Sequence, residues 1–225
     1  MKSLHALVVV LLLAGTASAQ SAADYGLLST GSLLAGGTNP YALTASSVSG
    51  TYSLYIPGNT SWPVGNPWIA NSSTAQWLAI YSGNSVPNST AAVPTVAAGT
   101  YTISYSFDLT SAVASNISFA INAAVDNSLS VSLNGTSLTN VGSAVATVNY
   151  DSLSHYQYFV NSTALHGGLN TLEFAVTNAS GGGSNPAGLY VTYSQLTVIP
   201  EPSTYALFLG VGTLAAAACV RRFRR

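Results

Sequence analysis

The chain has 225 residues and a formal net charge of −1 at neutral pH, and only 5% of its residues are charged. All five basic residues lie near the two ends, as Lys2 and as Arg221, Arg222, Arg224 and Arg225. The long segment between them has no cation to neutralise phosphate, which excludes a nucleic-acid-binding surface, and no arginine to clamp a phosphate or carboxylate substrate.

Residues 1–19 have the three regions of a secretory signal peptide. Lys2 supplies a basic start, residues 4–14 form a short apolar core, and Ala17-Ser18-Ala19 places small residues at a cleavage point. We therefore predict that Gln20 is the first residue of the mature chain. An uncleaved N-terminal anchor is the alternative, which the short core and the Ala-x-Ala site disfavour.

Residues 20–197 are expected to form one all-β exported body. The single cysteine, Cys219, lies outside this segment, so no disulfide can stabilise the body and folding depends on its core. Apolar and polar residues alternate along residues 101–109. This alternation predicts a strand with one buried face and with Asp108 pointing to solvent.

Further strands follow in the same pattern. Residues 119–125 and 129–133 alternate on either side of Asp126-Asn127-Ser128, which predicts a hairpin. Its second strand runs into Asn134-Gly135, two residues that tolerate the positive φ of a tight turn. Residues 172–176 form another strand with Glu173 outward. The last strand, residues 189–198, loses its alternation near Gln195, which predicts a β-bulge.

Strands rich in Thr, Val, Tyr and Ile, separated by turn residues at these intervals, are typical of antiparallel sandwiches. Five segments together resemble a jelly-roll domain of exported bacterial proteins that is similar to galactose-binding-like modules. They are Phe107-Asp108-Leu109, Asp126-Asn127-Ser128 and the ranges 131–135, 168–178 and 186–189. The resemblance covers roughly residues 77–198 and implies an antiparallel β-sandwich of the jelly-roll type.

Residues 198–225 combine three unlike features in a fixed order. Pro200-Glu201-Pro202 is followed by an uncharged, mainly apolar run of 17 residues, 204–220, and then by the arginine cluster. As a helix this run is about 25 Å long, enough for a short transmembrane helix, and the arginines beyond it are expected to stay cytoplasmic. A simple tail anchor is the alternative.

This order of parts resembles the PEP-CTERM sorting signal of exported proteins in Gram-negative bacteria. The resemblance implies that the chain is a substrate of exosortase, a membrane-embedded cysteine peptidase or transpeptidase. It implies cleavage near the motif and release of the body to the cell surface or matrix. It assigns Pro200, Glu201 and Pro202 to recognition, and Arg221, Arg222, Arg224 and Arg225 to membrane retention.

Patterns for catalysis or metal binding are weak in the body. The acids nearest in sequence, Asp108 and Asp126, fall on different predicted elements and are expected to be outward strand or turn residues. The two histidines of the body lack zinc-ligand spacing. Asp126 with Asn127, or Asp151, can offer oxygens to calcium, but without an Asp-x-Asp-x-Asp-Gly loop turn capping explains them better. No cofactor is predicted.

Aromatic side chains are the candidates for sugar binding, because their faces can stack on pyranose rings; packing in the core or in loops is the alternative. They are Trp62, Trp68, Trp77, Tyr81, Tyr156 and Tyr158. Three hypotheses follow for the function of the body. It is a non-catalytic surface or matrix protein associated with exopolysaccharide, a carbohydrate-binding module with a specific glycan ligand, or, with least support from the sequence, a secreted glycan-active enzyme.

Overall fold

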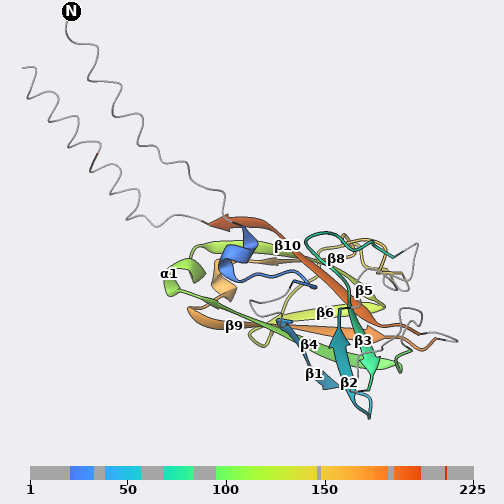
Figure 1. Cartoon of the computed structure of the whole chain (residues 1–225). Coiled ribbons are helices and arrows are strands. Elements are labelled where there is room, and N and C mark those ends of the chain that lie inside the picture. Colours follow the sequence, from blue (N-terminus) through green and yellow to red (C-terminus); the bar gives the residue numbers. More distant parts are fainter. Residues whose placement is uncertain are drawn as a thin grey trace, which may run out of the picture. The chain divides into compact units, whose positions relative to one another are not determined.

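A computed structural model describes residues 21–32, 39–56, 68–83, 95–145, 148–181 and 185–198, together with Val211. Residues 22–198 belong to one structural unit, shown in Figure 1. Its elements in chain order are η2 (Ala22–Tyr25), β1 (Tyr41–Ser46), β2 (Tyr52–Tyr55), β3 (Leu78–Ser82), β4 (Gly99–Leu109), α1 (Ser111–Ala114), β5 (Ile117–Asp126), β6 (Ser128–Leu133), β7 (Thr136–Ser137), β8 (Tyr156–Val160), η3 (Ser162–Ala164), β9 (Gly168–Asn178) and β10 (Gly188–Val198).

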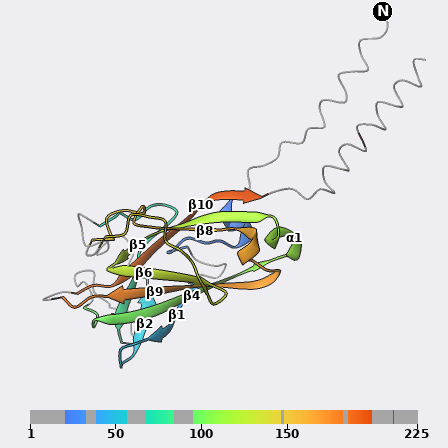
Figure 2. The same cartoon turned by 180° about the vertical axis from the view of Figure 1, so that it is seen from behind.

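The strands form two antiparallel sheets of five, with the orders β1-β4-β9-β6-β7 and β2-β3-β10-β5-β8 (Figure 1 and Figure 2). We call them the β9 sheet and the β10 sheet after their central strands. Apart from β6 and β7, consecutive strands from β3 to β10 alternate between the sheets. A double sheet of eight strands connected in this way is a jelly roll, to which β1 and β2 add one edge strand each. The prediction of an all-β sandwich is confirmed.

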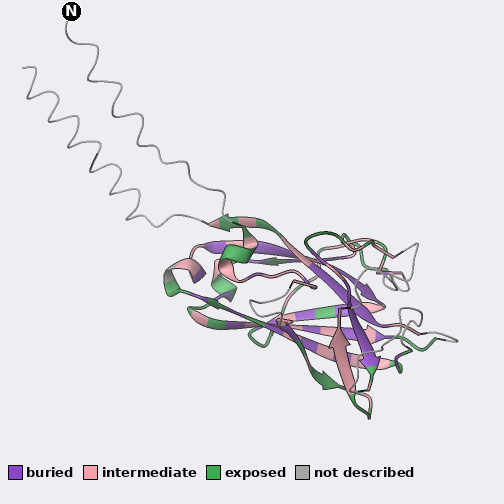
Figure 3. Cartoon of the chain, in the orientation of Figure 1, coloured by how far each residue is buried: buried purple, intermediate pink, exposed green. Residues whose placement is uncertain are grey.

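The core lies between the sheets and follows from the alternation of side chains. In β4 every second residue is buried and Asp108 is exposed, as predicted. In β9 Phe174 is buried, while Glu173 lies on the opposite face. Figure 3 shows this alternation of buried and more exposed residues along the strands. Because burying a side chain of the size of Phe174 contributes about 1.5–3 kcal/mol, such residues supply most of the stability of the unit.

The predicted bulge in the last strand is confirmed. Ser194 of β10 pairs with Ala120 of β5, and Thr197 pairs with Ser118, so three steps along β10 match two along β5. Gln195, inside this interval, has a φ of 52°. The additional residue bends β10 locally, because the ladder of hydrogen bonds is interrupted there.

The predicted hairpin of residues 119–125 and 129–133 is wrong. β5 pairs with β10 and β8, whereas β6 pairs with β9 in the other sheet. At the crossing, the N–H of Asn127 donates to the carbonyl oxygen of Thr177 (3.0 Å), and the Asn127 side chain accepts from the N–H of Ala179 (2.7 Å). Turn residues and alternation suit a hairpin and a crossing equally, because in both cases the apolar side chains enter the same core.

The second predicted turn is confirmed as a two-residue connection between β6 and β7. Leu133 pairs with Thr136, and Asn134 and Gly135 have φ values of 52° and 78°. Positive φ at both central residues is the geometry of a type I′ turn. The Asn134 side chain also accepts a hydrogen bond from the N–H of Thr171 (2.9 Å), which fastens the turn to β9.

Among the residues that the structure describes, no helix has the length and apolar character needed to cross a membrane. The predicted signal peptide, the motif Pro200-Glu201-Pro202 and the arginines Arg221, Arg222, Arg224 and Arg225 lie outside the described residues. The predicted membrane segment also lies outside them, apart from Val211.

Replacement of Gly135 tests the turn. A Cβ at this position meets no atom within 4 Å, so the strain of the positive φ is the only expected cost of Gly135→Ala. We expect the free energy of unfolding in urea to fall by about 1–2 kcal/mol. The control Ser137→Ala, at an exposed position of the same hairpin, should change it by less than about 0.5 kcal/mol. Equal stability of Gly135→Ala and the parent protein would contradict the type I′ geometry.

Candidate functional site

Most of the aromatic residues predicted to contact sugar are covered by other side chains. Four of them are buried: Trp77, Tyr81, Tyr156 and Tyr158. The prediction that these four offer a ring face to a ligand is therefore wrong. Trp68 is half-buried, and Trp62 lies outside the described residues.

Trp77, which is 0% exposed, belongs to a small second core on the outer face of the β10 sheet. Ala79 of β3 and Ala124 of β5 are in the same cluster, and these small residues leave room for large rings above the sheet. The Trp77 ring lies 4.7 Å from that of Trp68 and its Nε1 donates to the carbonyl oxygen of Ile69 (2.9 Å). Packing against residues of β3, β5 and β10, including the ring of Tyr190 at 5.6 Å, thus fixes Trp77. The sequence position of Trp77, just before β3, did not indicate that it is buried.

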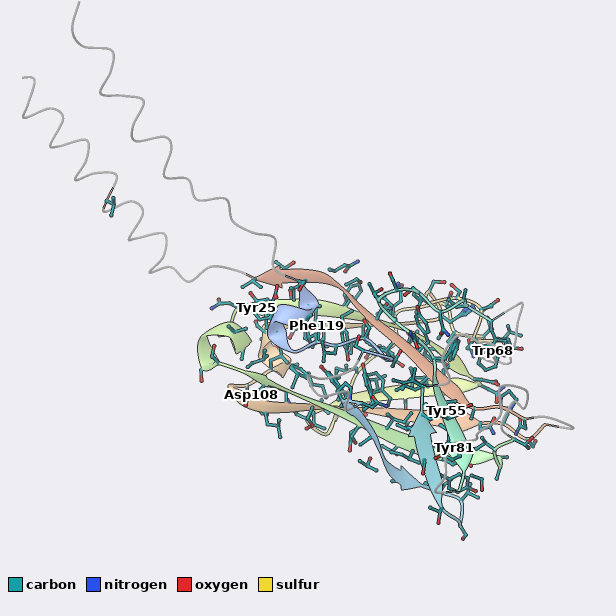
Figure 4. The ribbon with its side chains drawn as sticks, viewed as in Figure 1. Tyr25, Tyr55, Trp68, Tyr81, Asp108 and Phe119 are labelled. Carbon is teal, nitrogen blue, oxygen red and sulfur yellow. The ribbon has the colours of Figure 1, made fainter. Side chains whose placement is uncertain are left out.

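The remaining aromatic side chains at this end pack on one another. Trp68 stacks on Tyr150 with ring centres 4.7 Å apart and planes 19° apart. Tyr81 meets Tyr55 edge to face at 5.3 Å, and Figure 4 shows these two close together on β2 and β3, with Trp68 labelled separately. The half-buried Trp68 and Tyr150 form the outer layer of this aromatic cluster.

Asp126 adjoins the cluster and is 5% exposed, so the expectation that it points to solvent is wrong. Burial raises the pKa of its carboxyl group from 3.8 to about 6. The pKa of Tyr150 is raised by burial first, and then by the negative charges of Asp126 and Asp151. The structure therefore brings both predicted calcium candidates close to Tyr150.

Asp151 is engaged by a histidine. Its Oδ1 lies 2.6 Å from Nε2 of His155, and Nδ1 of the same ring lies 3.0 Å from the carbonyl oxygen of Ser143. Within the described ranges, no group of three or more His, Cys, Asp or Glu side chains is placed to hold a metal ion. Calcium binding by Asp126 or Asp151 stays a prediction.

A hollow of about 270 Å³ opens at the other end of the outer face, at the bulge of β10. The residues that line it are Ser118, Phe119, Phe159, Val160, Asn161, Gln195 and Thr197. Phe159 is 57% exposed, and it is the one aromatic side chain among the large exposed apolar residues of the described chain.

The hollow forms because three strands meet there with unequal side chains. Small residues of β5, Ser118 and Ala120, lie between the edge strand β8 and the bulged part of β10. Phe159 of β8 pairs with Ala120 on the neighbouring strand β5. On the other side of β5, the bulge displaces Gln195 from the regular ladder of β10. A large ring on one side and a bent strand on the other therefore border a shallow floor.

A row of polar side chains borders the hollow on the same face. Asn122 donates to the Ser194 hydroxyl (2.7 Å), and its Oδ1 accepts from Nε2 of Gln157 (3.0 Å). These amide and hydroxyl groups donate and accept hydrogen bonds without carrying charge. With an exposed ring beside them, the surface suits binding of a neutral polar ligand that has one flat apolar face.

Sequence reasoning missed Phe159, Asn161 and Gln195 as site residues, although one signal was available. In β8 the alternation places Tyr156 and Tyr158 inward, and hence Gln157 and Phe159 outward. A large apolar residue at an outward position marks an exposed binding candidate.

Comparison of the chain with models of known protein families gave no match. Comparison with curated proteins also gave no match.

Two alanine substitutions test the division between core and surface aromatics. Trp77→Ala should lower the free energy of unfolding in urea by about 3–5 kcal/mol, because it removes a fully buried ring. Phe159→Ala should lower it by less than about 1 kcal/mol, because more than half of this side chain is already exposed. A similar loss in both variants would show that Phe159 is part of the core.

The raised pKa of Asp126 predicts a pH-dependent stability. The folded state binds this proton more tightly than the unfolded chain, so the free energy of unfolding falls as pH rises from about 4 through about 6, and the loss is complete above that pH. A change of pKa from 3.8 to about 6 corresponds to about 3 kcal/mol at neutral pH. Asp126→Asn should recover up to this amount at neutral pH and little at pH about 4.

The pH dependence of stability is measured by urea unfolding at several pH values from about 4 to neutral. The proteins compared are the parent, Asp126→Asn and the exposed control Asp108→Asn. Asp108→Asn removes one exposed carboxylate from the same sandwich and serves as the matched change of charge. An unchanged profile in Asp126→Asn would contradict the assignment of the raised pKa to this carboxyl group.

Proposed function

We propose that the chain is a non-catalytic exported protein of the cell surface or extracellular matrix. Exosortase recognises Pro200-Glu201-Pro202 and cleaves the chain near this motif, and the released body stays with the exopolysaccharide of the producing cell. The order of the C-terminal features supports the processing step, and the surface chemistry of the body supports the association with polysaccharide.

The observation that carries the second part is the hydroxyl-rich outer face of the β9 sheet. Hydroxyl groups of neighbouring strands pair there at 2.9–3.0 Å, as in Thr44 with Ser104, Ser106 with Thr171 and Thr100 with Thr177. The body has no Lys or Arg to attract polyanions. Neutral donors and acceptors spread over a sheet suit neutral or weakly charged glycans.

Each contact of this kind is weak, because a net hydrogen bond contributes on the order of 1 kcal/mol. A single body is therefore expected to bind in about the micromolar to millimolar range, and many copies together give lasting retention. A carbohydrate-binding module with a specific glycan ligand is the second candidate function. The hollow beside Phe159 favours it, because it offers a defined place for one ring.

Intact mass and location of the mature protein test the processing step. In cells with active exosortase, we expect loss of residues 1–19 and of the arginine cluster, and a protein outside the inner membrane. Glu201→Gln should leave the uncleaved form in the inner membrane, while Glu173→Gln, a matched change on the β9 sheet, should be processed normally. A mature form that retains Arg221–Arg225 would rule the proposal out.

A further inference from the structure

We propose that the hollow at the β10 bulge binds one sugar ring of a neutral glycan, with Phe159 as the stacking surface and the amide groups of Asn161 and Gln195 as hydrogen-bonding partners. The inference rests on the proposed association with polysaccharide and names the site and the ligand class.

The exposure of Phe159 is the first observation. The neighbouring outward position of β8 is occupied by the polar Gln157. The residue that pairs with Phe159 on β5 is Ala120, which is only 2% exposed. More than half of Phe159 is exposed to water, and exposure of an apolar ring to water is unfavourable in free energy. A ligand with an apolar face, such as the C–H face of a pyranose, covers such a ring favourably.

Asn161 supplies an oriented donor. Its Oδ1 accepts from the N–H (3.2 Å) and the hydroxyl (2.6 Å) of Thr163, which fixes the amide at the start of η3. Among the described residues, none accepts a hydrogen bond from its Nδ2. Asn161 also lines the hollow, so its NH₂ group is available there as a donor to a sugar hydroxyl.

Gln195 supplies a second amide from the opposite strand. The bulge holds its backbone at a φ of 52°, and its side chain lines the hollow together with Thr197. It is exposed and has no hydrogen-bond partner among the described residues. Amides from β10 and from the end of β8 thus flank the position where a ring stacked on Phe159 would lie.

Size and charge restrict the ligand. The volume of about 270 Å³ is just below the range of about 300–1,000 Å³ typical of ligand pockets, so the hollow accepts one ring and not an enclosed oligosaccharide. No charged side chain lines it. The row of Asn122, Gln157 and Ser194 continues on the same face, where the next sugar of a chain can lie.

Saturation-transfer NMR on the mature protein tests the proposal with methyl glycosides of glucose, galactose and mannose as probes. We expect transfer to at least one of them in the parent protein, and at least a tenfold loss of affinity in Phe159→Ala. Gln195→Gly keeps the positive φ and removes the amide, so a loss of about fivefold is expected. The control Leu169→Ala, at an apolar residue of the β9 sheet that is 62% exposed against 57% for Phe159, should bind like the parent.

Three results would overturn the proposal. They are absence of transfer to all three probes in the parent protein, unchanged binding in Phe159→Ala with an unchanged melting temperature, and a Phe159→Ala effect on self-association alone. The last would make this face a contact between copies of the chain.

Retention of the same proteins on the exopolysaccharide of the producing strain separates the two proposals. Retention of the parent protein without any probe binding would leave the matrix proposal standing and reject the hollow as its site. Probe binding without retention would leave the hollow standing as a sugar site and reject the association with the matrix.

Discussion

Burial of apolar side chains between the two sheets is the interaction on which the rest of the structure depends. The body has no disulfide and no Lys or Arg, so neither cross-links nor Lys or Arg ion pairs can substitute for the core. Buried tyrosines extend it toward the N-terminal segment. Tyr105 donates to the carbonyl oxygen of Gly26 and accepts from the N–H of Leu28, and Tyr41 donates to the carbonyl oxygen of Leu28. Each hydroxyl is satisfied where its ring is buried, so the polar atom adds little cost.

The same packing decides what the two outer faces offer. On the β9 sheet, short hydroxyl side chains satisfy one another across strands, as in Ser106 and Thr171. On the β10 sheet, alanines of β3 and β5 admit a second aromatic core at one end, and the bulge opens a hollow at the other. The sandwich therefore has one broad hydroxyl surface and one face with a localised site. This difference is why the matrix association and the sugar site can be tested separately.

The bulge at Gln195 connects fold and candidate site most directly. An additional residue in β10 interrupts the regular pairing with β5 between Ser194 and Thr197. It also places Gln195 in the lining of the hollow together with the exposed Phe159 and the small Ser118. Local departures from a regular sheet commonly re-aim side chains in this way, and they persist only where the surrounding strands hold them in place.

The sequence by itself determined the strand alternation in β4 and β9, the Asn134-Gly135 turn and the bulge near Gln195, because the two-residue period and positive φ are properties of neighbouring residues. Only the tertiary structure decided that β5 and β6 enter different sheets, since Asn127 is held by Ala179, 52 residues later. It also decided that Trp77 and Asp126 are buried and that Phe159 borders a hollow. Burial depends on which strands and loops lie above a residue, and those partners are distant in the chain.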